Sequence, residues 1–316
     1  MSSIETVLIT GANAGLGKDS ARQLALMPTT KKVYLGCRNE QKAIEAKRSL
    51  EETTGKKIFE IVIIDTSDLD SVRAAVASLS EPLDGLIMNA GGPGGPQAGE
   101  KTGEGVLHAF SVNVLGHVVL VDELIAANKL TQTAVYVSTE AARGIPVMGM
   151  ARPALKSSSV DDFVAIADGS MFAKFDPMVA YGLIKYTATM WMSSMARRHP
   201  KIRFVSVSPG ATSGTNAADQ VGAFQKFVFT KIAYPMLTLF GRAHGLEQGA
   251  KRYVDVLIDD KFESGHFYAS AWPGTSGGLV DQGPVFEDLK NEQFQDNAYI
   301  AIRGFLESEA QEQASV

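Results

Sequence analysis

The sequence predicts an α/β protein with a doubly wound, mostly parallel seven-stranded sheet and helices on both faces. Short apolar stretches without polar alternation recur along the chain, and stretches of helical spacing separate them. Such stretches are typical of strands that are buried on both faces of a parallel sheet. A glycine cluster at 11–17 lies between the first strand and the first helix. One domain is expected for all 316 residues, because an α/β domain of this length can bury a large core.

The individual elements follow from local sequence patterns. Strands are expected where apolar residues cluster, at 7–10, 32–36, 61–64, 83–89, 133–137 and 202–207. Helices are expected at 18–26, at 40–54, after a cap at 67–68, at 105–127 and around Tyr181. Two longer segments interrupt the alternation, an insertion at about 140–180 and a segment at about 212–245.

Composition excludes several functional classes. A net charge of -5 leaves no basic footprint for nucleic acid. The single cysteine, Cys37, excludes an internal disulfide, and no CxxC or histidine-rich cluster indicates a metal site. The first residues lack a charged leader, and no apolar run is expected to be long enough for a membrane span. A reducing, cytoplasmic location is therefore expected.

Tyr181 and Lys185 are a candidate acid/base pair. Residues four positions apart lie on one face of a helix, so the lysine charge can lie beside the phenol. A positive charge favours ionisation of a tyrosine, whose ordinary pKa is about 10, and makes proton exchange with a substrate easier. The alternative is a chance pair whose lysine is solvated.

Three glycines indicate a nucleotide site. Gly11, Gly15 and Gly17 follow the first strand and open the first helix. Residues without side chains let the backbone turn sharply and approach a pyrophosphate, which binds at the positive end of the helix. The alternative is an ordinary glycine-rich loop.

Arg38 predicts NADP rather than NAD. It ends the second strand, about 20 residues beyond the glycines, where an NAD-selective fold carries an acid. A guanidinium there can pair with the adenosine 2′-phosphate, and Lys18 can add charge. A solvated surface arginine is the alternative. For the neighbouring Cys37, a buried strand-end thiol is favoured over a reactive thiolate.

The order of five motifs resembles that of the short-chain dehydrogenase/reductase family over about residues 6–268. The motifs are Thr10-Gly11-x-x-x-Gly15-x-Gly17, Asn89-Ala90-Gly91, Asn113 before Val114-Leu115-Gly116-His117, Tyr181-x-x-x-Lys185 and Pro209-Gly210. The resemblance implies a Rossmann fold that binds NADP(H). The cofactor residues that it implies are Gly11, Asn13, Ala14, Gly15, Leu16, Gly17, Arg38, Asp65, Thr66, Asn89, Ala90, Gly91, Tyr181, Lys185, Pro209, Gly210 and Thr212.

The same resemblance implies the catalytic roles. Tyr181 is expected to be the general acid/base, Lys185 to hold the nicotinamide ribose and activate the tyrosine, and Asn113 to serve a water-linked proton relay. The family's serine pair aligns with Ser138 and Thr139, and the second position makes Thr139 the catalytic candidate, with Ser138 as a substitute. Alternatively, the hydroxyl only satisfies local backbone.

The branch of the family is indicated by smaller features. The segments 36–39, 113–117 and 264–268 resemble retinol dehydrogenases and light-dependent protochlorophyllide reductases, and the long insertion resembles the second group. Ala211 stands where the latter carry cysteine, and no acid lies between Tyr181 and Lys185. These departures favour another substrate.

Apolar residues indicate a bulky hydrophobic substrate. Large flexible side chains can line a pocket beyond the carboxyl ends of the strands. They are Met148, Met150, Met171, Phe172, Phe175 and Met178 in the insertion, and Phe224, Phe227, Phe229, Tyr234, Met236, Leu237, Leu239 and Phe240 in the later segment. Extra core, or a dimer or membrane-surface helix, is the alternative.

The expected activity is hydride transfer between NADP(H) and the carbonyl or alcohol of that substrate. A light-dependent protochlorophyllide-type reductase and a non-catalytic NADP-sensing protein are the alternatives. Members of the family often form homo-oligomers, so an oligomer is a further expectation.

Overall fold

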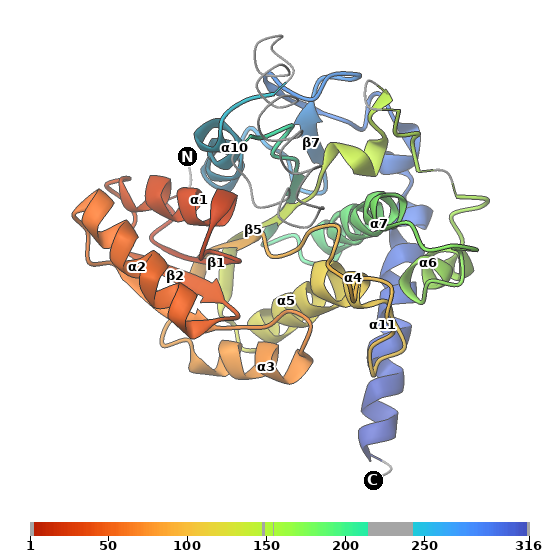
Figure 1. The fold of residues 1–316 in the computed structure, drawn as a ribbon, viewed down its shortest axis with the longest axis horizontal. Helices are drawn as coiled ribbons and strands as arrows, with labels where there is room; N and C mark the ends of the chain where they lie inside the picture. Colours follow the sequence, from red (N-terminus) through yellow and green to blue (C-terminus); the bar gives the residue numbers. More distant parts are fainter. Residues whose placement is uncertain (1–2, 147–148, 154, 214–242, 315–316) are drawn as a thin grey trace.

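A computed structural model describes residues 3–146, 149–153, 155–213 and 243–314 as one twisted sheet between two layers of helices (Figure 1). The strand order is β3-β2-β1-β4-β5-β6-β7-β8. The strands are β1 Thr6–Thr10, β2 Lys32–Cys37, β3 Phe59–Ile63, β4 Leu83–Met88, β5 Leu130–Val137, β6 Arg203–Val207, β7 Phe267–Ser270 and β8 Leu279–Asp281. The predicted α/β class is therefore confirmed.

The sheet has one strand more than predicted. Strands β1 to β7 pair in parallel, and β8 adds an antiparallel edge next to β7. The sequence pattern missed β8 because three residues with one apolar side chain exposed, Val280, carry no strand signal.

The helices form two layers. They are α1 Gly15–Ala25, α2 Glu40–Thr54, α3 Leu69–Ser78, α4 His108–Phe110, α5 Gly116–Ala126, α6 Val160–Ala167, α7 Pro177–Arg198, α10 Leu246–Ile258 and α11 Glu292–Ala314, with a π-helix η1 Ser111–Leu115 and 3-10 helices η2 Glu140–Arg143 and η6 Glu287–Lys290. Helices α1, α2 and α10 share one apolar core with the sheet, and α3, α5, α6, α7 and α11 share the other.

Side-chain caps explain where several helices begin. The Asn39 side chain accepts from the backbone of α2. Asp68 does the same for α3, where the sequence predicted a cap at 67–68. Asp176 caps α7, and Pro177 occupies its first turn, where a missing N–H costs nothing. These caps fix where the long helix with Tyr181 starts.

Strand β1 lies at the topological switch point of the sheet. It pairs with β2 on one side and with β4 on the other. Strands β2 and β3 are therefore added on one side of β1, and β4 to β8 on the opposite side. In such sheets the loops after β1 and β4 diverge and leave a crevice at the carboxyl ends. The glycine cluster follows β1, and Asn89-Ala90-Gly91 follows β4.

Part of the insertion is core. Phe163 and Ile166 of α6 are fully buried against α7 and α11, so the extra-core alternative holds for this helix. Phe172 and Phe175 are half-buried and pack edge to face, with ring centroids 6.0 Å apart. Met178 remains exposed. Met148 lies outside the described residues. So do the apolar residues of the later segment, from Phe224 to Phe240, that were predicted to line a pocket.

One helical stretch is long and apolar enough to cross a membrane by length and composition, which the sequence analysis did not anticipate. It runs from His108 to Ala126, and most of it is buried inside the fold. Its apolar character is that of a core helix, because α5 packs against β5 and α3 and most of its residues are buried.

Candidate active site

Lys185 joins three segments at the carboxyl edge of the sheet. Its fully buried ammonium donates to the backbone carbonyl of Val137, the last residue of β5, at 2.8 Å. A Cβ added to Gly91, after β4, would lie 3.4 Å from the same ammonium. Helix α7 therefore holds its lysine between the ends of β4 and β5, beside the crevice.

Tyr181 lies one helical turn before Lys185 and is half-buried. The ammonium lies 5.7 Å from the centroid of its ring and 4.6 Å from that of Tyr136. Burial raises the pKa of Tyr181 well above its ordinary value, and the Glu140 carboxylate adds to the rise. Burial also lowers the pKa of Lys185 to about 7. The expected lowering of the tyrosine pKa is therefore wrong for this structure, because burial outweighs the attraction of a half-ionised lysine.

The two candidate hydroxyls have different surroundings. Ser138 is buried and lies 2.9 Å from the hydroxyl of Thr189, which itself donates to the carbonyl of Lys185. The Ser138 proton is therefore used between β5 and α7. Thr139 is half-buried, and its oxygen accepts from the backbone of Ala141 at the start of η2. The Thr139 proton has no such use, so the geometry favours Thr139 as a donor to a ligand.

Asn113 lies in the π-helix η1, a rare conformation that often marks functional sites. Its side-chain amide donates to the carbonyls of Gly92 and Ala109 and accepts from the Gly92 backbone N–H at 3.0 Å. Its own carbonyl accepts from the Tyr136 hydroxyl at 2.9 Å and pairs with His117. Almost every polar position of Asn113 is thus occupied, and one acceptor position remains on Oδ1. The predicted water relay stays a prediction.

The glycine turn leaves backbone accessible at the start of α1. Gly11 and Gly15 have φ values of 68° and 55°, which favour glycine. A Cβ at Gly17 would lie 2.5 Å from both the Gly11 carbonyl and the side-chain nitrogen of Asn89, whereas one at Gly15 would meet nothing within 4 Å. Ala14, the residue before α1, supplies no side-chain cap. Asn13 and Leu16 beside it are half-buried. This open turn fits a pyrophosphate.

Two residues predicted for the adenosine end of the cofactor, Arg38 for the 2′-phosphate and Asp65 for the adenine, lie just after β2 and β3. Arg38 has 70% of its side chain exposed, and its Nε lies 3.7 Å from a carboxylate oxygen of Asp65. Lys18 donates to Ser49 of α2 at 2.9 Å. Thr66 is buried, and α5 contacts its carbonyl closely enough that Gly116 has no room for a Cβ. The largely exposed guanidinium, which pairs with Asp65 at 3.7 Å, is accessible to an anionic ligand.

Cys37 is a buried strand-end residue. Its side chain is 1% exposed, and burial raises the pKa of its thiol to about 11. The thiolate alternative is therefore excluded, because a thiol this weakly acidic stays protonated at neutral pH.

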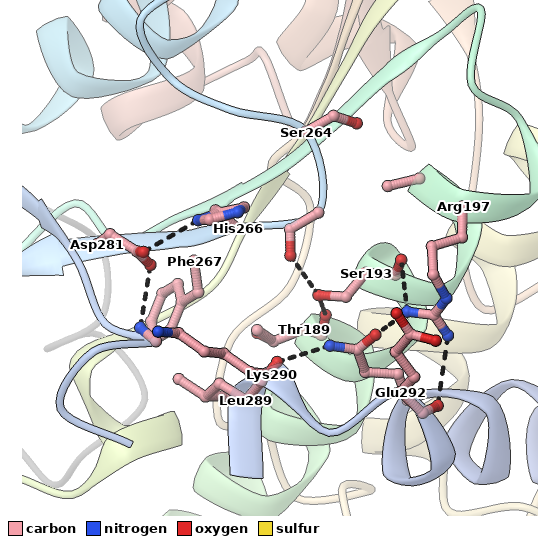
Figure 2. Close-up of a pocket in the computed structure, with 14 residues that line it drawn as sticks. Thr189, Ser193, Arg197, Ser264, His266, Phe267, Asp281, Leu289, Lys290 and Glu292 are labelled. Atoms are coloured by element: carbon pink, nitrogen blue, oxygen red, sulfur yellow. Dashed lines mark hydrogen bonds and ion pairs between the residues drawn. The ribbon is translucent and has the colours of Figure 1, made fainter. Parts of the chain in front are cut away.

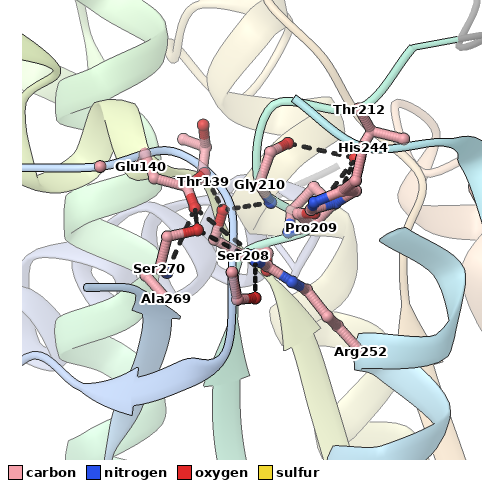
Figure 3. A network of polar contacts seen from close by, with 12 residues as sticks. Thr139, Glu140, Ser208, Pro209, Gly210, Thr212, His244, Arg252, Ala269 and Ser270 are labelled. Atoms are coloured by element: carbon pink, nitrogen blue, oxygen red, sulfur yellow. Dashed lines mark hydrogen bonds and ion pairs between the residues drawn. The ribbon is translucent and has the colours of Figure 1, made fainter. Parts of the chain in front are cut away.

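The loop after β6 is held by a histidine that the sequence analysis missed. Thr212 donates to the carbonyls of Pro209 and Gly210, and His244 lies 2.6 Å from the Pro209 carbonyl and 3.2 Å from the Thr212 hydroxyl. Figure 3 shows Thr212 and His244 next to Pro209 and Gly210. The predicted residues Pro209, Gly210 and Thr212 thus form one ordered turn at the carboxyl edge.

A buried ionic network behind that loop was also missed. Glu140, next to Thr139, bonds the hydroxyls of Ser208 and Ser270, and its carboxylate lies 3.6 Å from the guanidinium of Arg252 (Figure 3). Arg252 in turn donates to the carbonyl of Ser208 and to the hydroxyl of Ser270. The only local signal was an acid placed three residues after the end of a buried strand. The network ties the ends of β5, β6 and β7 together.

A cavity of about 300 Å³ lies elsewhere, at the amino end of β7. Figure 2 shows that Ser193 and Arg197 of α7, His266 and Asp281 line it together with the start of α11. Because the crevice lies at the carboxyl ends of the strands, this cavity is separate from the candidate site.

The fold and the crevice define the class of protein, a doubly wound α/β protein with a glycine turn at its switch point. A family profile described as short chain dehydrogenase matches residues 5–144. Retinol dehydrogenase 11 of Homo sapiens is 37% identical over 133 residues, which cover 41% of this chain and 40% of the relative. Protochlorophyllide reductase B of Oryza sativa subsp. japonica is 27% identical over 298 residues, 88% of this chain and 71% of that protein.

Solved structures agree on the fold. L-sorbose reductase from Gluconobacter frateurii superposes with a TM-score of 0.62 at 19% identity, over 88% of this chain and 98% of that chain. The profile match and the two relatives confirm the predicted resemblance to the short-chain dehydrogenases/reductases, and these relatives include a retinol dehydrogenase and a protochlorophyllide reductase, as the resemblance indicated. The chain spans 40% and 50% of the length of the first two curated relatives.

Proposed function

We propose that this protein is an NADP(H)-dependent oxidoreductase that transfers a hydride between nicotinamide and the carbonyl or alcohol of a bulky hydrophobic substrate. One observation carries the proposal. The buried Lys185 ammonium lies between the ends of β4 and β5, one helical turn after Tyr181, and it donates to Val137, two residues before Thr139. A phenol and an ammonium on α7 and a hydroxyl shortly after β5 therefore lie at the carboxyl edge of the sheet, together with Gly91.

The residues of the crevice fit a dinucleotide. The open backbone at Gly15 and the uncapped start of α1 suit a pyrophosphate, because backbone N–H groups and the helix dipole attract anions. The exposed Arg38 suits a 2′-phosphate, since a guanidinium can make charge-assisted hydrogen bonds to it. Bound NADPH would supply the hydride.

The protein's own residues would handle the proton. In reduction, Tyr181 donates its proton to the oxygen of the carbonyl while Thr139 donates a hydrogen bond to the same oxygen. A raised pKa suits this direction, because the phenol remains protonated until the substrate oxygen gains charge. Lys185 stabilises the tyrosinate that is left, and two of its three protons are not needed by Val137. Asn113 keeps its proposed part in returning a proton from water.

The substrate class rests on the surface beside Tyr181. Met178 and Val179, at the start of α7, are exposed, and the half-buried pair Phe172 and Phe175 precedes them. Apolar side chains on the surface before Tyr181 would favour entry of a hydrophobic molecule. Retinol dehydrogenase 11, one of the relatives, is named for such a compound.

The test is a spectrophotometric screen of hydrophobic aldehydes, ketones and alcohols, with all-trans-retinal as the first aldehyde, against both nicotinamide cofactors. Oxidation of NADPH that depends on the aldehyde, with weaker use of NADH, is expected. Absence of NADPH binding by calorimetry would refute the proposal outright.

A light-dependent double-bond reductase is the second candidate. It is favoured by the similarity to the rice protochlorophyllide reductase, which covers 88% of this chain. Ala211 and the acid-free stretch between Tyr181 and Lys185 count against it, since they depart from the resemblance on which it rests. Illumination of protein with NADPH and protochlorophyllide, followed by absorbance, distinguishes the two.

A further inference from the structure

His117 is a fully buried titratable residue to which the proposed mechanism gives no task. It lies at the start of α5, four residues after Asn113, and its ring is 0% exposed. Its Nδ1 lies 3.2 Å from the Asn113 carbonyl, and its Nε2 lies 3.0 Å from the hydroxyl of Thr10 at the end of β1. The ring therefore bridges the crevice wall and the π-helix.

The hydrogen-bond partners fix the tautomer of this ring. A carbonyl oxygen only accepts, so Nδ1 carries the proton toward Asn113. The Thr10 oxygen already accepts from the backbone N–H groups of Asn89 and Ala90, both at 2.9 Å. Its two lone pairs are then in use, and its proton is left to donate to a bare Nε2. Thr10 and His117 satisfy each other only if the imidazole is neutral with its proton on Nδ1.

The surroundings keep the ring neutral. Burial lowers the pKa of His117 to about 3, and the nearby Lys185 charge adds to the effect. The Tyr136 ring packs edge to face against the imidazole at 6.1 Å, and its hydroxyl donates to the same Asn113 carbonyl. A protonated ring would point a second donor at the Thr10 oxygen, which has no lone pair left for it.

We propose that His117 is a positioning residue, which, through Thr10, holds the strand end at Asn89 and Ala90 in the shape that receives the cofactor. The chain of bonds runs from these two N–H groups through the Thr10 hydroxyl to the imidazole and on to Asn113. This assignment rests on the proposed NADPH site. The side chain of Asn89 closes the same wall by donating to the Thr10 carbonyl at 2.9 Å.

Three variants test the assignment. His117→Phe keeps the aromatic bulk and removes both hydrogen bonds. His117→Gln offers one donor and one acceptor in their place, so it should rescue the function. His199→Gln, at the far end of α7, is the matched control.

The expected results do not depend on turnover. Long-range proton–nitrogen NMR of the wild type should show the Nδ1–H tautomer for one histidine ring, with no titration between pH 5 and 8. Amide exchange at Asn89 and Ala90 should accelerate roughly tenfold in His117→Phe, because the Thr10 hydroxyl loses its acceptor. The dissociation constant for NADPH should rise roughly tenfold in the same variant. Both should return to near wild type in His117→Gln.

Two outcomes overturn the assignment. One is a ring assigned to His117 that titrates near its ordinary pKa or carries its proton on Nε2. The other is a His117→Phe variant in which amide exchange at Asn89 and Ala90 and the dissociation constant for NADPH both stay at wild-type values. If that variant does not fold, a His117→Gln variant in which both quantities depart from wild type overturns the assignment. A wild type that binds no NADPH refutes the proposed function instead, while the tautomer and exchange measurements still decide the role of His117.

Discussion

The ammonium of Lys185 donates to the carbonyl of Val137 at 2.8 Å, inside a core where its side chain is 1% exposed. Helix α7 thereby places a titratable cation against the last residue of β5. Burial lowers the pKa of this lysine to about 7, which makes its charge sensitive to pH near neutrality. Four predictions follow from this site and its neighbours.

The contribution of Lys185 to stability should become less unfavourable as pH rises. Between the folded pKa of about 7 and the ordinary value of 10.5, the unfolded lysine binds a proton that the folded one has released. The lysine therefore destabilises the fold most below pH 7, and about 3 kcal/mol of that penalty disappears between pH 7 and 10. Urea unfolding at pH 7 and at pH 10 measures the free energies of unfolding of wild type and Lys185→Met. The difference between the two proteins should be smaller at pH 10.

The control for this prediction is Lys129→Met. Lys129 donates to the carbonyls of Val76 and Leu79 at 2.9 and 2.8 Å but is only half-buried. Lys129→Met therefore measures the loss of stability when a less buried lysine that also donates to backbone carbonyls is removed. A constant difference for Lys185→Met would mean that the buried lysine keeps an ordinary pKa.

Removing the Tyr181 hydroxyl should stop turnover without affecting the cofactor. Tyr181→Phe keeps the ring that packs near Lys185 but has no proton to give, so the rate should fall by roughly 100- to 10,000-fold. NADPH affinity by calorimetry should stay within roughly threefold of wild type, because no phosphate contact is lost. The matched control is Tyr34→Phe in β2, which loses a hydroxyl that is hydrogen-bonded to Ser80. Turnover that survives in Tyr181→Phe removes this tyrosine from the mechanism.

Substitution of Thr139 should lower activity, whereas substitution of Ser138 should mainly lower stability. Thr139→Ala removes the free hydroxyl and should lower the rate by roughly 10- to 100-fold, whereas Thr139→Ser should retain most of it. Ser138→Ala loses the buried bond to Thr189 and should cost about 1 kcal/mol of stability with little loss of rate. Steady-state kinetics and thermal unfolding of all three variants check this. If Ser138→Ala instead shows the larger loss of rate, the catalytic hydroxyl is the serine.

Arg38 should discriminate between the two cofactors. Arg38→Ala loses charge-assisted hydrogen bonds to the 2′-phosphate, so NADPH affinity should fall roughly 10-fold while NADH affinity changes little. The effect should weaken at high salt, because the side chain is largely exposed. Arg48→Ala, on the exposed face of α2, is the control. An equal loss for both cofactors would show that Arg38 does not contact that phosphate.

The order of the elements could be predicted because it depends on local patterns. The predicted helix 40–54 matches α2 residue for residue, since Asn39 and Gly55 mark its ends with side-chain and left-handed caps. The short strand β8 could not be predicted, because its pairing with β7 depends on a contact between segments and not on its own three residues.

The network around Glu140 shows why part of the site was missed. Glu140 lies 130 residues from Ser270 along the chain and bonds it directly in the fold. His244 lies 35 residues beyond Pro209 and reaches its carbonyl at 2.6 Å. No spacing rule links residues so far apart in sequence, so only the folded chain reveals such pairs.

The sequence by itself determined the fold class, the glycine turn and the presence of Tyr181 and Lys185 on one helix, because turns and helix faces depend on residues a few positions apart. Only the tertiary structure decided that Ser138 points toward α7 while Thr139 keeps a free proton, and that burial raises the pKa of Tyr181. The direction of a side chain and its loss of water depend on what packs against it. Those partners come from other strands and helices, and folding alone brings them together.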